Sequence, residues 1–256
     1  MTLDLESINR KVQFHSEYPL LFASVSGSHL YGFSSPDSDI DVRGVHLVSV
    51  SDVAGLKPYK ETCEESHGDY DIVTHDLRKF CRLLVKGNGN SFEALWSPHV
   101  VFGREGRFYR LRDLAQGVLS RRIADHYGGM SYQQWRFFEH RKFGQVKPLL
   151  YSFRALLSGI YTLQTGIIEA HLPTLLSKVV GYDLSFIPPL IERKLAGPEK
   201  AVLSEAHLQP YYEKWVDLKA ILSRTIVDSP LPTNVPDKGF ADLNEFVIGV
   251  TRANGL

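Results

Sequence analysis

Hydrophobic residues in the first hundred positions switch between helix-like and strand-like spacing. Short apolar runs rich in β-branched residues predict three strands, within residues 20–27, 39–50 and 70–77. A polar loop is expected over residues 49–65, between the second and third strands. A one-sided apolar pattern over residues 76–87 predicts a helix directly after the third strand. We therefore expect a small N-terminal unit of three strands with flanking helices.

Helical spacing dominates the chain from about residue 104 onward, and strand signals fade there. The apolar positions predict helices over residues 106–119, 131–143, 147–168, 199–224 and 240–253. A proline-rich segment separates the last two. The change of pattern predicts an α+β protein with two domains, a mixed one over residues 1–103 and a helical one over residues 104–256.

Composition narrows the class of protein. The 256 residues hold 29 basic and 29 acidic side chains, which argues against a protein that coats nucleic acid through bulk charge. Two cysteines cannot form a disulfide framework or a four-cysteine zinc site. The N-terminus carries acids where a signal peptide needs basic residues, and the longest uncharged apolar-rich run, residues 155–168, is too short to span a bilayer. We expect a cytoplasmic protein that does not enter the membrane.

Charge is distributed unevenly along this neutral chain. Residues 104–154 hold 11 basic and 4 acidic side chains, interleaved with ten aromatic residues. Such a mixture can hold phosphates and stack bases, but it is also typical of core helices with arginines on their wet face. If a polyanion binds here, five cations are expected to line its groove: Arg136, Arg141, Lys142, Lys147 and Arg154.

The most specific chemical pattern is a Gly-Ser pair followed by paired aspartates. Gly27-Ser28 ends the first predicted strand, and Asp39 and Asp41 begin the second. Because residues i and i+2 of a strand point to one face, Asp39 and Asp41 present two carboxylates together. Asp71, on the third predicted strand, is expected to add another, and Asp69 is the fallback if the register differs by two.

Converging carboxylates need cations, and Mg²⁺ suits them because it prefers oxygen ligands and keeps sites open for phosphate. Gly27 allows a close backbone approach, and the Ser28 hydroxyl and nearby amides can hold a phosphate. An Asp-x-Asp pair alone is a weak signal, since the chain contains three; the upstream Gly-Ser makes the combination specific. The bland alternative is a Ser/Asp-rich turn that caps a helix or strand.

The segments GSHLYGFSSPDSDIDVRG and LRKFCRLLVKGNGNSFEALWSP resemble a known family. They are similar to the GS…DxD nucleotidyltransferases of the DNA polymerase β superfamily, and within it to the YcgL-type branch, the RNA repair pathway polymerase β family. The resemblance covers most of residues 20–170. It implies a minimal palm with a short mixed sheet and flanking helices, followed by a C-terminal helical domain. It also implies Mg²⁺-dependent transfer of a nucleoside monophosphate from an NTP, with loss of pyrophosphate.

By matching position, the resemblance implies that Gly27 and Ser28 hold the triphosphate and that Asp39, Asp41 and Asp71 bind metal and are catalytic. Further nucleotide-binding candidates are Arg43, Lys86, Asn88, Lys147 and Arg154. Arg43 either touches phosphates or pairs with an aspartate. The glycines of residues 86–90 have a structural explanation, a helix stop at Gly87 and a new helix capped by Asn90 or Ser91.

Three functional hypotheses follow. The first is an NTP-dependent nucleotidyltransferase with two Mg²⁺ ions, for which Mn²⁺ is a possible substitute; ATP is the favoured NTP and an RNA 3′ end the favoured acceptor, with an RNA ligase as a possible partner. The second is transfer of AMP to a protein hydroxyl, which needs no polyanion-binding surface. The third is a catalytically idle nucleotide-binding protein, whose expected mark is a lost carboxylate; all three carboxylates are present here.

Overall fold

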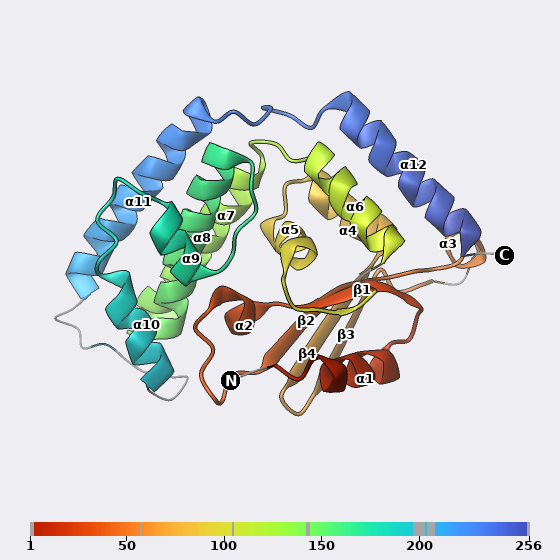
Figure 1. The fold of residues 1–256 in the computed structure, drawn as a ribbon, viewed down its shortest axis with the longest axis horizontal. Helices are drawn as coiled ribbons and strands as arrows, with labels where there is room; N and C mark the ends of the chain where they lie inside the picture. Colours follow the sequence, from red (N-terminus) through yellow and green to blue (C-terminus); the bar gives the residue numbers. More distant parts are fainter. Residues whose placement is uncertain are drawn as a thin grey trace. The chain divides into compact units, whose positions relative to one another are not determined.

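The computed structural model describes residues 3–56, 58–103, 105–141, 144–196, 203 and 208–254 (Figure 1). The chain forms two compact units, each described here by itself. The sheet unit is drawn from Met1–Leu30, Asp39–Ser120 and Asn234–Leu256. The helical unit is drawn from Tyr31–Ser38 and Arg121–Thr233.

A mixed five-stranded sheet forms the centre of the sheet unit. Its strands are β1 (Leu20–Val25), β2 (Ile40–His46), β3 (Thr62–His67), β4 (Tyr70–Asp76) and β5 (Val100–Phe102). They lie in the order β3-β4-β2-β1-β5. Strands β2 and β4 pair in parallel, and every other pairing in the sheet is antiparallel. The parallel pair at the centre decides which side chains of the two strands lie next to each other.

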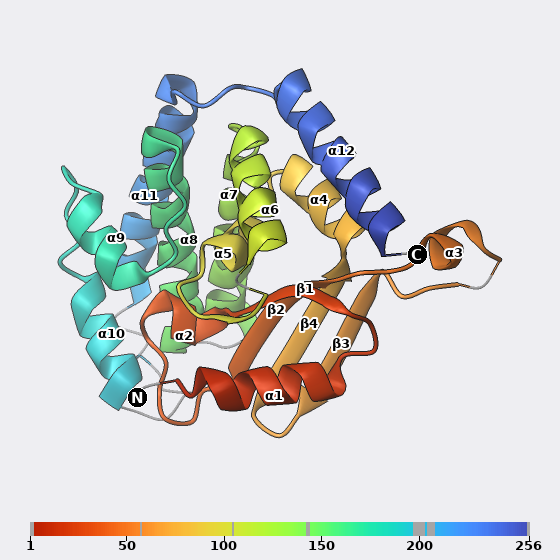
Figure 2. The same cartoon turned by 45° about the vertical axis from the view of Figure 1, so that its right-hand side comes forward.

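Helices cover both faces of this sheet (Figure 2). They are α1 (Leu5–His15), α2 (Gly27–Tyr31, its last residue in the helical unit), α3 (Val50–Ala54), α4 (Leu77–Val85), α5 (Gly89–Trp96), α6 (Gly106–Gly117) and α12 (Asp237–Ala253). Ile8 and Val12 of α1 pack on Val42 and Ile72 of the central strands. On the other face, Phe22 packs against Phe80 of α4 and Phe108 of α6, with ring centroids 5.6 Å and 5.3 Å apart.

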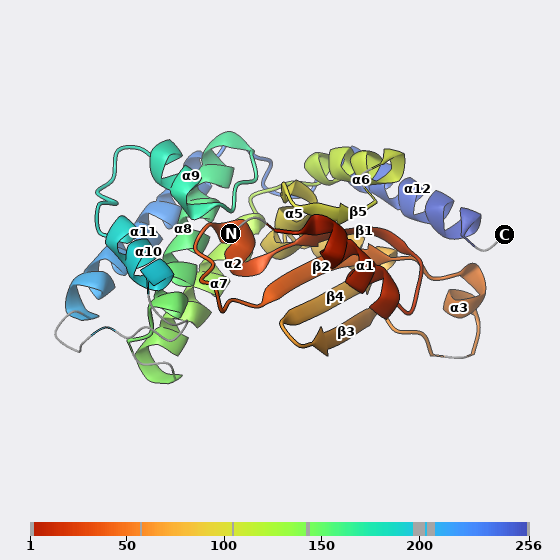
Figure 3. The same ribbon diagram turned by 60° about the horizontal axis from the view of Figure 1, so that its bottom comes forward.

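The last helix, α12, lies beside α6 (Figure 3). The two helices approach most closely where Gly239 meets the backbone of Gly117, and a Cβ at Gly239 would collide with the Gly117 carbonyl oxygen. Glycine is needed at position 239 for this close backbone contact. The C-terminal segment therefore belongs to the same compact unit as the sheet.

The helical unit is built around α8, whose side chains are buried on nearly all sides. Its described elements are α7 (Ile123–Arg136), the π-helical turn η1 (Phe137–Arg141), α8 (Val146–Thr165), α9 (Leu172–Lys178), α10 (Ile187–Ala196) and α11 (Leu208–Asp228). Helices α7 and α11 both pack on α8. Trp135 stacks on Trp215 with ring centroids 4.8 Å apart, and the Trp215 indole donates a 3.0 Å hydrogen bond to Ser131.

The three predicted strands are confirmed, but the loop predicted over residues 49–65 is wrong in part. It contains α3, and β3 begins at Thr62. Strand β3 is an edge strand without a buried residue, so it lacks the apolar alternation on which strand prediction rests. Strand β5 has three residues and is too short to give a periodic signal.

The helices predicted over residues 106–119, 147–168 and 240–253 are confirmed within three residues at each end. The helix expected over 131–143 instead begins at Ile123 and passes into η1 at Phe137; its last two expected residues lie outside the described part of the chain. In place of the one expected over 199–224, α11 spans Leu208–Asp228. Across the described residues, none of the helices combines the length and apolar character that crossing a membrane requires.

Candidate active site

The Gly27-Ser28 turn lies directly over the carboxylate of Asp41. The chain leaves β1 at Val25, and Gly27 begins α2 with a positive φ of 61°. A Cβ at position 27 would overlap the Asp41 carboxyl group. The Ser26 amide donates a 2.8 Å hydrogen bond to the Asp41 carbonyl oxygen, and Ser28 is buried. Glycine is therefore needed at position 27 for two reasons: the backbone has a positive φ, and a side chain would collide with the Asp41 carboxylate.

Parallel pairing of β2 and β4 places Asp41 directly beside Asp71. The next residues along the strands, Val42 and Ile72, point to the opposite face and are buried under α1. This alternation turns both aspartates toward the face that carries α4 and α5. Asp69 is exposed just before β4, where its carbonyl oxygen accepts a 2.7 Å hydrogen bond from the Ile40 amide.

Arg43 joins the two aspartates. Its Nη2 lies 3.0 Å from Oδ1 of Asp41 and 3.0 Å from Oδ2 of Asp71. Its Nη1 donates to the carbonyl oxygens of Val42 and Asp71, at 2.9 Å and 3.0 Å. Of the two roles considered for Arg43, the structure shows the pairing with aspartates. One guanidinium thus balances part of the negative charge that two neighbouring carboxylates create.

The donor chemistry of this face fits a divalent metal ion, although a complete ligand set is not formed. One oxygen of Asp41 and one of Asp71 each lie 3.0 Å from the same Nη2 atom of Arg43, so the two carboxylates are close neighbours. Carboxylate oxygens are the ligands that Mg²⁺ prefers. Asp39 lies one residue before β2 and is exposed. Within the described ranges, no three His, Cys, Asp or Glu side chains are arranged to hold an ion. Two of the three predicted ligands are therefore brought together.

A cavity of about 130 Å³ opens beside Arg43 on the same face of the sheet. Val73 and His75 of β4 line it, and so do residues of α4 and of the segment that begins α5, among them Asn88, Asn90 and Ser91. Burial, reinforced by the nearby Lys79, His46 and Arg43, lowers the pKa of His75 to about 4. His75 is thus neutral at pH 7.

His75, Asn90 and Ser91 were not among the candidate site residues. For His75 a sequence signal did exist, because it follows Asp71 by four residues on the same strand and so shares its face.

Asn88 lies in this cavity, whereas Lys86 does not. Asn88 caps α5, and its side chain accepts a 3.1 Å hydrogen bond from the Ser91 amide. The expected caps, Asn90 and Ser91, are therefore wrong, while the helix stop at Gly87 is confirmed by its φ of 76°. Lys86 is exposed and lines a different pocket, between α4 and α12.

Two further candidates, Lys147 and Arg154, lie on α8 in the helical unit. Lys147 is partly buried, whereas Arg154 is fully buried, with its guanidinium carbon 3.8 Å from the centre of the Tyr31 ring. The prediction that Arg154 is exposed in a groove for a polyanion is therefore wrong. Lys142 and the Arg141 side chain lie outside the described residues, and Arg136 is exposed.

Half of the ten aromatic residues of the basic segment belong to the core. Five of them are buried: Phe108, Tyr127, Trp135, Phe138 and Phe153. Tyr109 and Tyr132 are exposed and Phe143 lies outside the described residues. Arg121 donates to the carbonyl oxygens of Val227, Ser229 and Leu231, which is a structural role. The segment is therefore not a single basic surface, and its arginines differ in function.

Residues 2–249 match the family model of the RNA repair pathway DNA polymerase beta family. The chain belongs to this family. The resemblance drawn from the Gly-Ser and Asp-x-Asp segments is thereby confirmed, and the protein is a nucleotidyltransferase. Its mixed sheet with flanking and C-terminal helices agrees with the α+β fold expected of such an enzyme.

Two known proteins are similar to this chain in sequence over most of its length. The uncharacterized protein MJ0002 of Methanocaldococcus jannaschii is 25% identical over 225 residues, covering 86% of this chain and 89% of the relative. The uncharacterized protein YcgL of Bacillus subtilis is 26% identical over 185 residues, covering 70% and 71%. A nucleotidyltransferase-like protein from Exiguobacterium sibiricum has a crystal structure that aligns with a TM-score of 0.28 at 11% identity, covering 96% of this chain and 78% of that one.

Proposed function

We propose that this nucleotidyltransferase transfers a nucleoside monophosphate from an NTP, with ATP favoured, to the 3′ hydroxyl of an RNA. The observation that carries the proposal is the placement of Asp41 beside Asp71 under the Gly27-Ser28 turn. Two carboxylates next to a turn with free backbone conformation at Gly27 suit a metal-bound triphosphate, because the carboxylates can hold the metal and the turn amides can hold a phosphate. Membership of the family adds independent support.

The residues divide the work of the reaction. Gly27 and Ser28 hold the triphosphate through the turn amides and the Ser28 hydroxyl. The acceptor hydroxyl attacks the α-phosphorus, its new P–O bond replaces the bond to the β-phosphate oxygen, and pyrophosphate leaves. Asp71 accepts the hydroxyl proton. Two Mg²⁺ ions at Asp39, Asp41 and Asp71, with Mn²⁺ as a substitute, would supply charge neutralisation at the leaving group and acidify the acceptor hydroxyl.

Arg43, placed by its pairing with both aspartates, is available to the phosphates when a cation takes over its partners. The nearby cavity with Asn88 extends this face and is the place we assign to the sugar or base. Lys147 and Arg154 belong to the proposal only as residues of the helical unit, and Arg154 lies in a buried position there.

RNA is favoured as acceptor because the family model is that of an RNA repair pathway and because exposed cations such as Arg136 remain on the basic segment. Action alongside an RNA ligase and a cytoplasmic location are parts of the same proposal. The protein's two cysteines, Cys63 and Cys81, are free thiols, as is usual for proteins of the reducing cytoplasm. The proposed division into a catalytic domain of residues 1–103 and a substrate-binding domain of residues 104–256 assigns roles; in the structure α6 and α12 lie in the sheet unit.

The experiment is incubation with each labelled NTP in the presence of total RNA or total protein, with Mg²⁺ added. We expect label on RNA, and none with the Asp41→Asn variant. Label on protein instead would replace the RNA acceptor by a protein hydroxyl. Absence of transfer to either polymer beside retained NTP binding would favour a catalytically idle nucleotide-binding protein.

A second measurement tests the RNA surface. If Arg136 contacts an RNA phosphate, Arg136→Ala should reduce the slope of log affinity against log salt by about 0.7 for a single strand. The exposed Arg10 of α1 provides the matched control, Arg10→Ala, which should leave the slope unchanged. An affinity for RNA that does not depend on salt would contradict the phosphate contacts.

A further inference from the structure

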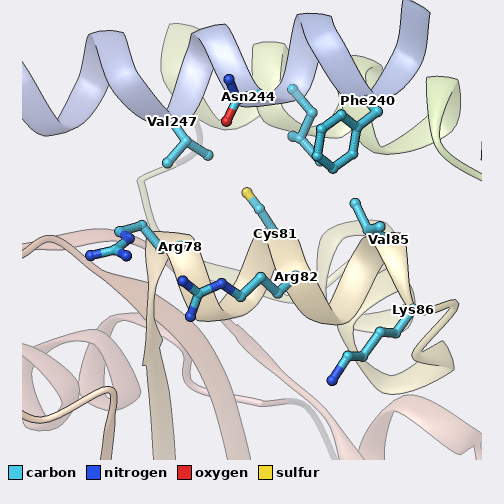
Figure 4. Close-up of a pocket in the computed structure, with 9 residues that line it drawn as sticks. Arg78, Cys81, Arg82, Val85, Lys86, Phe240, Asn244 and Val247 are labelled. Carbon is cyan, nitrogen blue, oxygen red and sulfur yellow. The ribbon is translucent and has the colours of Figure 1, made fainter. Parts of the chain in front are cut away.

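A second pocket in the sheet unit lies between α4 and α12, away from the cavity beside Arg43. Its volume is about 360 Å³, within the range of pockets that hold small molecules. Residues of one face of each helix line it: Arg78, Cys81, Arg82, Val85 and Lys86 from α4, and Phe240, Leu243, Asn244 and Val247 from α12. In Figure 4, Phe240 and Val247 point from α12 toward Cys81 and Val85 of α4.

The two facing helices pack against each other only along part of their length. Packed helices bring their apolar stripes into direct contact. Here Cys81 of α4 and Leu243 of α12 are buried, but an open space remains beside them, and Phe240 is 53% exposed although it lies on the side of α12 that faces α4. Exposed aromatic surface is unfavourable in water, so a ligand with a flat apolar part would gain free energy by filling the space.

The charge of the lining is entirely positive. Arg78, Arg82 and Lys86 are spaced by four residues, so they follow one edge of α4, one turn apart. None of the lining residues is acidic. Arg82 has one acidic neighbour, Glu61, at 3.5 Å, and Arg78 lies 3.5 Å from the hydroxyl of Tyr59. Burial raises the pKa of the Cys81 thiol, which therefore adds no negative charge.

One polar group lies on the opposite wall. Asn244 follows Phe240 by four residues, one turn further along the same side of α12. An amide both donates and accepts hydrogen bonds, as the edge of a nucleobase does. Asn244 is exposed, so water satisfies its amide in the free protein. A base stacked on Phe240 can replace that water with a direct hydrogen bond, which the chain of a fatty acid cannot offer.

We propose that this pocket is a second nucleotide site, which binds a free nucleoside monophosphate without a divalent metal. The base stacks on Phe240 and meets Asn244, and the phosphate lies at the edge formed by Arg78, Arg82 and Lys86. The proposal concerns a different pocket from the candidate active site, and it stands whether or not the acceptor is RNA. The inner face of α4 supplies Phe80 and Leu83 to the cavity beside Arg43, so one helix borders both pockets.

The test is calorimetric titration of the full-length protein with AMP in the presence of a chelator, which removes the metal that a triphosphate site needs. We expect binding of one AMP per chain. Arg82→Gln should weaken it about tenfold or more through the lost charged hydrogen bond. Phe240→Ala should weaken it about fivefold or more through lost stacking. Both residues are exposed, so neither substitution threatens the core.

Matched controls come from α1, where Arg10 and Phe14 are also exposed. Arg10→Gln, Phe14→Ala and Ser28→Ala should bind AMP as the parent does. Adenosine and inorganic phosphate should each bind at least tenfold more weakly than AMP, because each offers half of the contacts.

Four results would overturn the proposal: no binding of AMP, equal binding by phosphate alone, loss of binding in Ser28→Ala but not in Arg82→Gln, or binding of a short RNA without binding of AMP. The last result would assign the pocket to an RNA strand. None of these readouts depends on transfer activity, so failure here is distinguishable from failure of the proposed function.

Discussion

Arg43 on the sheet and Arg154 on α8 differ in what surrounds their guanidinium groups and in how exposed they are. Arg43 is about one third exposed and divides its guanidinium between two carboxylates. Arg154 is fully buried, with Tyr31 on one side and a 3.2 Å contact from Nη2 to the Met130 sulfur. The first arrangement is open to a charged ligand, whereas the second is built into a core.

This difference suits a partly exposed charge cluster to ligand binding and a buried charge to the stability of the fold. Paired charges near the surface contribute little to stability, so the proposed role of the cluster of Arg43, Asp41 and Asp71 is to bind a ligand rather than to stabilise the fold. A buried long side chain contributes through packing as well as charge. We therefore expect substitutions on the sheet to change activity and substitutions at Arg154 to change stability.

The largest effect is expected on the sheet. Asp41→Asn and Asp71→Asn should each lower nucleotide transfer by about a thousandfold or more, because each removes a charged oxygen from the metal face. Their melting temperatures should stay close to that of the parent. Asp69→Asn, two residues from Asp71 and outside the paired register, should stay within about tenfold. Initial rates measured under saturating NTP check this, and a larger loss in Asp69→Asn than in Asp71→Asn would reverse the assignment.

The next effect is on the stability of the helical unit. Arg154→Ala should lower the free energy of unfolding by about 2–4 kcal/mol, because it leaves a cavity and removes the cation from the Tyr31 ring. Arg154→Met, which keeps much of the volume, should recover part of that loss. Urea denaturation measures it, with the exposed Arg136→Ala as control, expected within about 0.5 kcal/mol of the parent. An unchanged midpoint for Arg154→Ala would mean that the site is not packed as described.

Arg43 should show the opposite behaviour. Arg43→Ala is expected to lower transfer about ten- to a hundredfold while changing the free energy of unfolding by less than about 1 kcal/mol, since its ion pairs are partly exposed. Arg43→Lys keeps the charge but not the fork that reaches both aspartates, so it should recover little activity. If Arg43→Ala unfolds the protein as strongly as Arg154→Ala, the contrast between the two regions fails.

The smallest effect concerns pH. His75 has a folded pKa of about 4, below its ordinary value of 6.5, because it is partly buried and lies near cations. The unfolded chain therefore binds a proton between these values that the folded chain does not, and stability should fall as pH drops from 6.5 toward 4. His75→Gln should show a shallower loss of melting temperature over that window. The exposed His67→Gln is the control, and equal slopes in both variants would contradict a neutral, buried His75.

The sequence allowed prediction of which strand residues share a face with Asp41, because strand geometry is local. Alternation alone puts Asp41 and Arg43 on one face and Val42 on the other, and the single acid flanked by apolar residues identifies Asp71. Helices are less informative, since Lys147 and Arg154 share a face but spacing does not show whether that face is buried. The pocket between α4 and α12 joins segments more than 150 residues apart, and no local pattern predicts such a meeting.

The central claim is that Asp41 and Asp71 form one metal-binding face. Electron paramagnetic resonance of Mn²⁺ titrated into the protein tests it without any acceptor or assay of transfer. We expect Asp71→Asn to weaken Mn²⁺ binding by about tenfold or more and Asp69→Asn to leave it unchanged, because Asp71 and not Asp69 lies in register with Asp41. Equal Mn²⁺ affinities in the parent and in Asp71→Asn would contradict it.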